Sequence, residues 1–370
     1  MKIYEERRLK LTENLSGDIA VIIPGSVLAN RSNDTAYPFR QDSNFYYLSG
    51  FNEPDSTLMI ISKSGKTNSI GFVPKKDKLK EIWDGFRYGP EGMKSDFGFN
   101  DAFNNDEIDE LLPDLLDGVS CVYYPFGKVD GFDQKVINWT KKANSKDRHS
   151  KKMEIADISK IIGNKRLIKD SSEINIIEKA CKISANAHLE AMKFVKPGMN
   201  EAEVEAFYLY EFAKNGGRFP AYNPIVASGE NACVLHYVEN NQVINDGDLL
   251  LIDAGCEYEM YASDITRTFP ANGKFSDEQL QIYKIVLEAQ KASVDAVSKG
   301  NGVMDPQTIS EKVITEGLID LGIIKGNLEE EHEKGSFKDF YMHKIGHWMG
   351  MDVHDVGAVS YTHLTLPTKA

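Results

Sequence analysis

The segment Asp246–Phe269, DGDLLLIDAGCEYEMYASDITRTF, constrains the fold more than any other part of the chain. Its apolar run LLLI predicts a short buried strand, and Asp253 stands at the end of that run. Asp264 then opens a second strand pattern, DITRTF. If the two strands pair antiparallel, both carboxylates lie on one face, roughly 5 Å apart at Cβ.

Two carboxylates that close repel each other. One of them must take up a proton, or a cation must lie between them. The alternative is that Asp253 caps a turn and Asp264 is solvated, in which case neither has a special role. The pair alone leaves both interpretations open.

Histidines near the end of the chain favour the interpretation in which a cation lies between the carboxylates. Four of the eight histidines lie in the last 28 residues, and three of them, His343, His347 and His354, fall within twelve residues and are flanked by glycines. The first two would share a helix face, although the nearby glycines favour irregular chain instead. His236 ends the run GENACVLH and is a fourth candidate. Together these residue types predict a metal-dependent site.

The remaining histidines have simpler interpretations. His188 lies inside a helical pattern, so we expect it in the core. His149 and His332 lie in charged stretches, and we expect them to be solvated.

Composition excludes several classes of protein. A length of 370 residues favours two domains. The net charge of −13 disfavours binding to nucleic acid or to an anionic membrane. No apolar run is long enough to span a bilayer, and the N-terminus lacks the apolar core of a signal peptide, so we expect a cytoplasmic protein. Four cysteines without a CxxC pair predict buried free thiols, with neither disulfides nor structural zinc.

The first half of the chain reads as a small α/β domain. Residues 18–24, 56–63 and 69–74 are β-branched, apolar runs bounded by turn residues, which predicts strands. Residues 101–118 have helical spacing and would cross over between strands. Residues 141–165 are rich in Lys, Ser and Asp, so we place the domain boundary at residue 165.

The second half begins with clear helix signals. Capping boxes start at Asp170, Asn200 and Ser276, and Asp305-Pro306 starts a further helix. The order is helix pair, strands, helix pair, strands. It predicts an α+β domain with two similar halves.

Several long motifs resemble one family. YNPIVASGENACVLHY, LLLIDAGCEYEMYASDITRTFPANGKFS and YMHKIGHWMGMDVHDVG resemble the catalytic segments of the Xaa-Pro aminopeptidases (aminopeptidase P). RSNDTAYPFRQDSNFYYLSGFNEPDS and EIWDGFRYG extend the resemblance through the first half. It implies an α/β creatinase-like N-terminal domain at residues 1–165. It also implies an α+β pita-bread catalytic domain at residues 166–357.

The resemblance assigns roles to the candidate residues. Asp253 and Asp264 would be metal ligands, the second bridging two ions, and His347 would be the imidazole ligand. An oxygen-rich set with one nitrogen favours two divalent ions, Mn²⁺ first among them. Two such ions can hold a bridging hydroxide as the nucleophile. His236, His354 and His343 would be the catalytic-site histidines, with His354 the candidate to stabilise the oxyanion.

The implied substrates are peptides with proline at the second position. Trp83 and Arg87 lie in the motif that, in this family, approaches the site of a neighbouring subunit, so we expect a homo-oligomer, a dimer or a tetramer. Prolidases and methionine aminopeptidases share the metal ligands. The former differ in the motifs quoted above, and the latter usually lack the N-terminal domain. A non-catalytic pita-bread protein that binds peptides is an alternative of another class, although such proteins typically lose the ligands that this chain has.

The last thirteen residues depart from the family. The resemblance implies two further glutamate ligands and an arginine beyond Gly357, whereas AVSYTHLTLPTKA contains no acidic residue. We therefore expect residues 358–370, His363 included, to be a non-native tail. We also expect a catalytic domain that is incomplete at its C-terminus. This chain would then have three of five metal ligands and be inactive as it stands.

Overall fold

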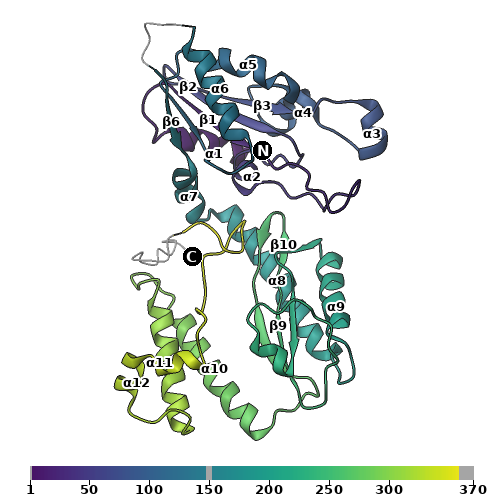
Figure 1. Ribbon diagram of the computed structural model, residues 1–370, viewed down its shortest axis with the longest axis vertical. Helices are drawn as coiled ribbons and strands as arrows, with labels where there is room; N and C mark the ends of the chain where they lie inside the picture. Colours follow the sequence, from purple (N-terminus) through teal and green to yellow (C-terminus); the bar gives the residue numbers. More distant parts are fainter. Residues whose placement is uncertain (1, 147–151, 358–370) are drawn as a thin grey trace. The chain divides into compact units, whose positions relative to one another are not determined.

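The structure is a computed structural model that describes residues 2–146 and 152–357. It divides into two compact units, Met1–Ile168 and Lys169–Ala370 (Figure 1). The boundary that we expected at residue 165 precedes this division. His149 and the expected tail with His363 lie outside the described residues.

A mixed sheet forms the centre of the first unit. Among the described residues its strands lie in the order β4-β3-β2-β1-β5-β6. The bounds are β1 Ile19–Pro24, β2 Thr57–Lys63, β3 Lys66–Val73, β4 Asp101–Asn104, β5 Cys121–Tyr124 and β6 Glu154–Asp157. Antiparallel ladders join β1 to β2 and β2 to β3. Every residue of β1 is buried, as befits a central strand covered on both faces. The three predicted strands are confirmed.

Helices surround this sheet (Figure 1). They are α1 Lys2–Thr12, α2 Ser43–Ser49, α3 Lys78–Asp84, α4 Gly89–Phe97, α5 Ile108–Leu115, α6 Phe132–Asn144 and α7 Ser159–Leu167. The helix predicted over 101–118 is wrong in its first part. Residues 101–104 form β4 parallel to β3, and only after the 3-10 turn η1 (Asn105–Glu107) does α5 begin. Pairing with β3 overrides the local helical spacing, and the Asn104–Glu107 capping box sets the start of the helical chain.

A buried arginine ties α1 to three other elements. Arg8 is 1% exposed, and its guanidinium donates to the carbonyl oxygens of Leu48 (2.9 Å) and Gly98 (2.6 Å). It also donates to Ser69 Oγ (2.9 Å). Burial lowers the pKa of Arg8 to about 10, which still leaves it charged at neutral pH. One side chain therefore joins α1 to α2, β3 and the end of α4.

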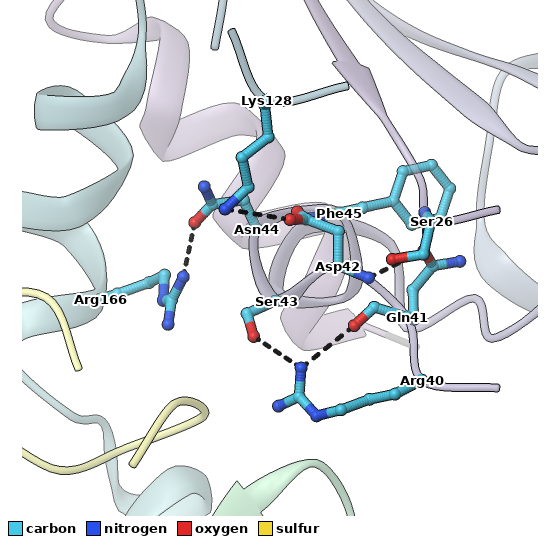
Figure 2. Close-up of polar contacts among 9 residues, drawn as sticks. All are labelled: Ser26, Arg40, Gln41, Asp42, Ser43, Asn44, Phe45, Lys128 and Arg166. Atoms are coloured by element: carbon cyan, nitrogen blue, oxygen red, sulfur yellow. Dashed lines mark hydrogen bonds and ion pairs between the residues drawn. The ribbon is translucent and has the colours of Figure 1, made fainter. Parts of the chain in front are cut away.

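Polar contacts also fix the start of α2 (Figure 2). Gln41 Oε1 accepts from the backbone N–H groups of Ser26 (2.7 Å) and Asp42 (2.9 Å). Asp42 in turn caps α2. Arg166 of α7 donates to Asn44 Oδ1 (2.6 Å), so α7 is held against α2. This contact helps to place α7 in the first unit, which extends three residues beyond the boundary that we expected at residue 165.

The second unit contains long helices and two small sheets. Its helices are α8 Ser171–Phe194, α9 Glu201–Lys214, α10 Asp277–Asp295, α11 Asp305–Asp320 and α12 Leu328–Lys334. Its strands are β7 Phe219–Pro220, β8 Ile225–Ser228, β9 Leu249–Asp253, β10 Cys256–Tyr258, β11 Tyr261–Ala262 and β12 Thr266–Pro270. Within the described residues they form the sheets β12-β9-β8 and β11-β10-β7. The three predicted capping boxes are confirmed.

His188 connects α8, α9 and the chain that follows β9. Tyr208 Oη donates to His188 Nδ1 (2.9 Å), and His188 Nε2 faces Ala254 O (3.3 Å). The ring is 3% exposed, which confirms the predicted core position. Burial lowers the pKa of His188 to about 4. The neutral ring, with its proton on Nε2, satisfies both contacts.

Residues 341–357 contain neither helix nor strand. Of our two interpretations of this segment, the irregular chain is therefore right and the shared helix face is wrong. The second set of strands that we expected does not occur before Gly357 in the described part of the chain. His332 is not solvated as we expected. It stacks on Phe337, with ring centroids 5.7 Å apart, and Nε2 lies 3.4 Å from Glu311 Oε2.

The four cysteines are free, as predicted. The expectation that they are buried holds for Cys256, while Cys233 is exposed and Cys121 and Cys181 are half-buried. In the part of the chain that the structure describes, each helix is too short or too polar to cross a membrane.

Replacing Arg8 by methionine tests its role in the first unit. Arg8→Met removes the donors from buried carbonyl groups, and we expect the free energy of unfolding to fall by about 3 kcal/mol. Denaturation in urea measures this change. Lys10→Met, at an exposed site of the same helix, is the control. A loss below about 1 kcal/mol in Arg8→Met would contradict the assigned role.

The buried His188 predicts a loss of stability in acid. Between pH 6.5 and pH 4 the unfolded chain binds a proton at this histidine and the folded protein does not, so stability falls as the pH falls. At pH 5 the loss from this group is about 2 kcal/mol. The difference in unfolding free energy between pH 7 and pH 5 should shrink by that amount in His188→Asn. An exposed-site control, His343→Asn, should keep the wild-type difference.

Candidate functional site

The β9 strand carries the first candidate residue. Leu250 and Ile252 are fully buried and anchor the strand in the core, and Asp253 is its last residue. The predicted antiparallel pairing of β9 with β12 is confirmed. However, the residue directly opposite Asp253 is Thr266. Asp264 precedes Thr266 by two residues, so it is the diagonal neighbour on the same face.

A tyrosine hydroxyl bridges the two carboxylates. Tyr222 Oη lies 2.5 Å from Asp253 Oδ1 and 3.0 Å from Asp264 Oδ1. A hydroxyl has one proton to donate, so it cannot satisfy both carboxylates fully. Burial and the two nearby negative charges raise the pKa of Tyr222, which keeps the phenol protonated. The sequence reasoning missed this residue, although it lies in the motif YNPIVASGEN.

The Tyr222 hydroxyl does not balance the charge of the carboxylate pair. Burial raises the pKa of Asp253, and the nearby charge of Asp264 contributes a further increase. Three oxygen atoms converge with a single hydroxyl proton between them. An additional proton or a cation would remove this deficit.

His347 lies on the other side of Asp264. Its Nε2 is 3.0 Å from Asp264 Oδ2, and its Nδ1 is 3.0 Å from Trp348 O. Both ring nitrogens therefore face oxygen acceptors. An imidazolium satisfies both with its two N–H groups. His347 and Asp264 are also residues that would hold a cation.

His354 stacks on His347. The ring centroids are 4.0 Å apart, with an angle of 19° between the planes. His343 is exposed, and its Nδ1 lies 2.7 Å from Lys344 O. His236 is exposed in the turn after the 3-10 helix η2 (Gly229–Cys233). Among the described contacts, no hydrogen bond or ring contact joins these last two histidines to the carboxylate pair.

The residues at this site fit a cation in part. Asp253 and Asp264 offer carboxylate oxygens, and His347 offers an imidazole nitrogen. This set of donor atoms suits hard or borderline divalent ions. Yet the described residues contain no group of three His, Cys, Asp or Glu side chains arranged to hold one metal ion. Further donors, or a shift of the Tyr222 hydroxyl or the His347 ring, would be needed to surround an ion.

Glycine is required two residues after the β9 carboxylate. A Cβ atom built on Gly255 would lie 1.7 Å from the carbonyl oxygen of Ser263. The two chain segments that carry Asp253 and Asp264 approach each other here at backbone distance. Any larger residue would separate the two carboxylates.

Two family profiles match the sequence. Residues 175–369 match "Metallopeptidase family M24", and residues 4–123 match "Aminopeptidase P, N-terminal domain". The chain belongs to metallopeptidase family M24. These matches confirm the resemblance read from the motifs. They also confirm an N-terminal domain of the aminopeptidase P type followed by a pita-bread catalytic domain.

Relatives in this family are similar over most of the chain. The Xaa-Pro aminopeptidase of Haemophilus influenzae is 41% identical over 96% of this chain and 80% of its own length. That of Escherichia coli is 39% identical over 96% of this chain and 81% of its own length. The solved structure of Pseudomonas aeruginosa aminopeptidase PepP has a TM-score of 0.93 at 41% identity, covering 96% of this chain and 81% of that one.

The structural likeness extends to other solved aminopeptidases. Proline aminopeptidase P II from Yersinia pestis has a TM-score of 0.94 at 39% identity, covering 96% of this chain and 83% of that one. A zinc-substituted E. coli aminopeptidase P in complex with product has a TM-score of 0.94 at 38% identity, covering 96% of this chain and 82% of that one. That relative therefore accepts a divalent metal.

Removing one carboxylate tests the charge deficit. In metal-free protein, Asp264→Asn removes the repulsion on Asp253, so the free energy of unfolding should rise by about 1 kcal/mol at pH 7. The sign follows from the raised pKa of Asp253, whose charged form destabilises the folded state.

The same variant should lose the stabilisation that Mn²⁺ produces in the wild type. Thermal unfolding with and without Mn²⁺ measures both effects. Glu316→Gln, at an exposed site on α11, is the control and should respond to Mn²⁺ as the wild type does. A destabilised metal-free Asp264→Asn protein that still responds to Mn²⁺ would contradict the assignment.

Proposed function

We propose that this chain is a metal-dependent aminopeptidase that releases the N-terminal residue from peptides with proline at the second position. The observation that carries the proposal is the linked array of Asp253, Tyr222, Asp264, His347 and His354. It occurs in an M24 chain whose relatives at 39–41% identity are Xaa-Pro aminopeptidases.

Asp253, Asp264 and His347 are the residues that would hold the metal. We propose two divalent cations, with Mn²⁺ as the ion, because carboxylate oxygens outnumber nitrogen in the donor set. Bound there, divalent cations would polarise the scissile carbonyl and lower the pKa of a water molecule. The three ligands named here are few for two ions. The sequence led us to expect an inactive chain, which remains untested; because three ligands can still bind metal weakly, we propose slow cleavage in its place.

The histidines would contact the substrate. His354, stacked on His347, is held beside the carboxylate pair and can donate an N–H to the oxyanion that forms at the scissile carbonyl. His236 and His343 are exposed, so a peptide could reach both. The proline nitrogen must gain a proton to leave, and an exposed imidazole is a suitable source.

Assembly and location extend the proposal. Trp83 on α3 is 87% exposed, with Leu79 and Ile82 beside it at 73% and 76%. Exposed apolar side chains in such number favour contact with another subunit. We therefore propose a homo-oligomer, a dimer or tetramer, in which Trp83 and Arg87 approach the neighbouring site. A cytoplasmic location stays a prediction.

Two alternatives give different results in assays. A prolidase would cleave Xaa-Pro dipeptides, whereas the proposed enzyme cleaves Xaa-Pro-Yaa tripeptides and leaves the dipeptides intact. A non-catalytic pita-bread protein would bind peptides without metal. The carboxylate pair and its histidines favour the enzyme over this last class.

An assay with His354→Ala tests the proposed site. The wild-type chain with Mn²⁺ should release the first residue of Xaa-Pro-Yaa slowly, and a chelator should abolish this release. His354→Ala should lower kcat about a hundredfold through loss of an oxyanion donor. Separation of the released amino acid by chromatography gives the rates.

His332→Ala, on α12, is the control and should keep wild-type kinetics. Cleavage that persists in His354→Ala at the wild-type rate would overturn the assigned role. Cleavage of Xaa-Pro dipeptides would favour the prolidase.

A further inference from the structure

A fully buried carboxylate lies at the start of α9. Glu201 is 0% exposed and accepts five hydrogen bonds. Oε1 accepts from Ser228 N–H (2.8 Å), Ser228 Oγ–H (2.7 Å) and Asn231 Nδ2–H (3.1 Å). Oε2 accepts from Tyr237 Oη–H (2.8 Å) and Gln242 N–H (3.0 Å). Every donor comes from the segment 228–242.

These donors close one loop of the chain. Ser228 is the last residue of β8 and Gln242 lies shortly before β9, so the carboxylate joins both ends of the loop. Asn231 and Tyr237 are bound from within it. The same helix end also donates to the loop, since the backbone N–H of Glu201 binds Gln242 O (2.9 Å).

The charge on Glu201 strengthens this anchor. Burial alone would raise the pKa of Glu201, but the backbone N–H groups of Ser228 and Gln242, with the side chains of Ser228 and Asn231, outweigh it and lower the pKa. Glu201 is therefore ionised at neutral pH. Hydrogen bonds to an ionised acceptor are shorter and about twice as strong as those between neutral groups.

His236 lies directly before the anchored tyrosine. Tyr237 is 7% exposed, whereas Leu235 and Val238 on either side are 54% and 50% exposed, and His236 is exposed as well. Side-chain packing does not hold exposed residues in place. The inward hydrogen bond of Tyr237 to Glu201, together with the packing of the Tyr237 ring against Ile225 and Ala227, sets the direction of this turn.

We infer that Glu201 is a positioning residue for His236, acting through Tyr237. The buried carboxylate fixes the turn from α9, and the imidazole next to Tyr237 is presented to the peptide substrate. This inference rests on the proposed function, in which His236 contacts the substrate. The five hydrogen bonds of Glu201 involve neither Asp253 nor Asp264.

Histidine NMR of the full chain tests the inference. In protein labelled with ¹³C-histidine, His236→Asn identifies the His236 ring signal by its loss. Glu201→Gln places an NH₂ group against the donors of the loop, so the His236 signal should shift or broaden. The signal of His188, on α8, should stay in place.

Two further variants sharpen the comparison. Tyr237→Phe removes one donor, leaves Glu201 in place and should also shift the His236 signal; it decides the question if Glu201→Gln does not fold. Glu203→Gln neutralises an exposed carboxylate in the same first turn of α9 and should leave the signal unchanged.

Kinetics give a second measurement. Glu201→Gln should lower kcat by about 10- to 100-fold, since a small misplacement of a group at the reacting bond is costly. The Mn²⁺-induced rise in melting temperature should not change. An unshifted His236 signal in both Glu201→Gln and Tyr237→Phe would overturn the inference and leave Glu201 a purely structural residue. If the wild type cleaves no peptide, the proposed function fails, while the NMR result still decides the positioning role.

Discussion

The site depends on one constraint: Asp253 and Asp264 lie close together with a single tyrosine hydroxyl proton between them. The pairing of β9 with β12 brings Asp264, two residues before β12, close to Asp253, and the single Tyr222 proton cannot serve both carboxylates. The surrounding fold keeps them there. Leu250 and Ile252 anchor β9 in the core, and Gly255 allows the return chain to approach at backbone distance. Packing in the core of the second unit offsets the unfavourable free energy of holding the two carboxylates together. A bound cation would reduce this repulsion.

Residues 341–357, which carry three histidines, have no regular structure, so polar contacts must hold this segment in place. Gly350 O accepts from the backbone N–H of Ala262, which joins the segment to β11. Asp355, whose side chain is 1% exposed, lies 2.8 Å from the Lys169 ammonium group. A buried ion pair adds little net stability, but breaking it leaves an uncompensated charge. These contacts hold the irregular chain beside Asp264, where His347 and His354 stack.

The sequence correctly predicted the features that depend on hydrogen bonds between nearby residues. The capping boxes at Asp170, Asn200 and Ser276 start helices because their hydrogen bonds lie within four residues. Long-range pairing was harder to read from the sequence. Residues 101–104 join β3 as a strand despite their helical spacing, and the register of β12 places Thr266 opposite Asp253. Tyr222 and Glu201 were missed for the same reason, since their partners lie 27 to 42 residues away along the chain.

Two carboxylates in the same domain show how hydrogen bonding separates structural from chemical roles. Glu201 is buried more completely than Asp253, and yet its pKa is lowered while that of Asp253 is raised. The difference lies in the number of donors and in the negative charge of Asp264 beside Asp253. Five hydrogen bonds saturate Glu201, so its charge is stable and offers nothing to a ligand. Asp253 shares the Tyr222 proton with Asp264, has a further hydrogen bond from Thr266, and retains the capacity to bind a cation. Burial alone therefore does not identify a carboxylate with a chemical role. A buried carboxylate with too few hydrogen-bond donors is the better candidate.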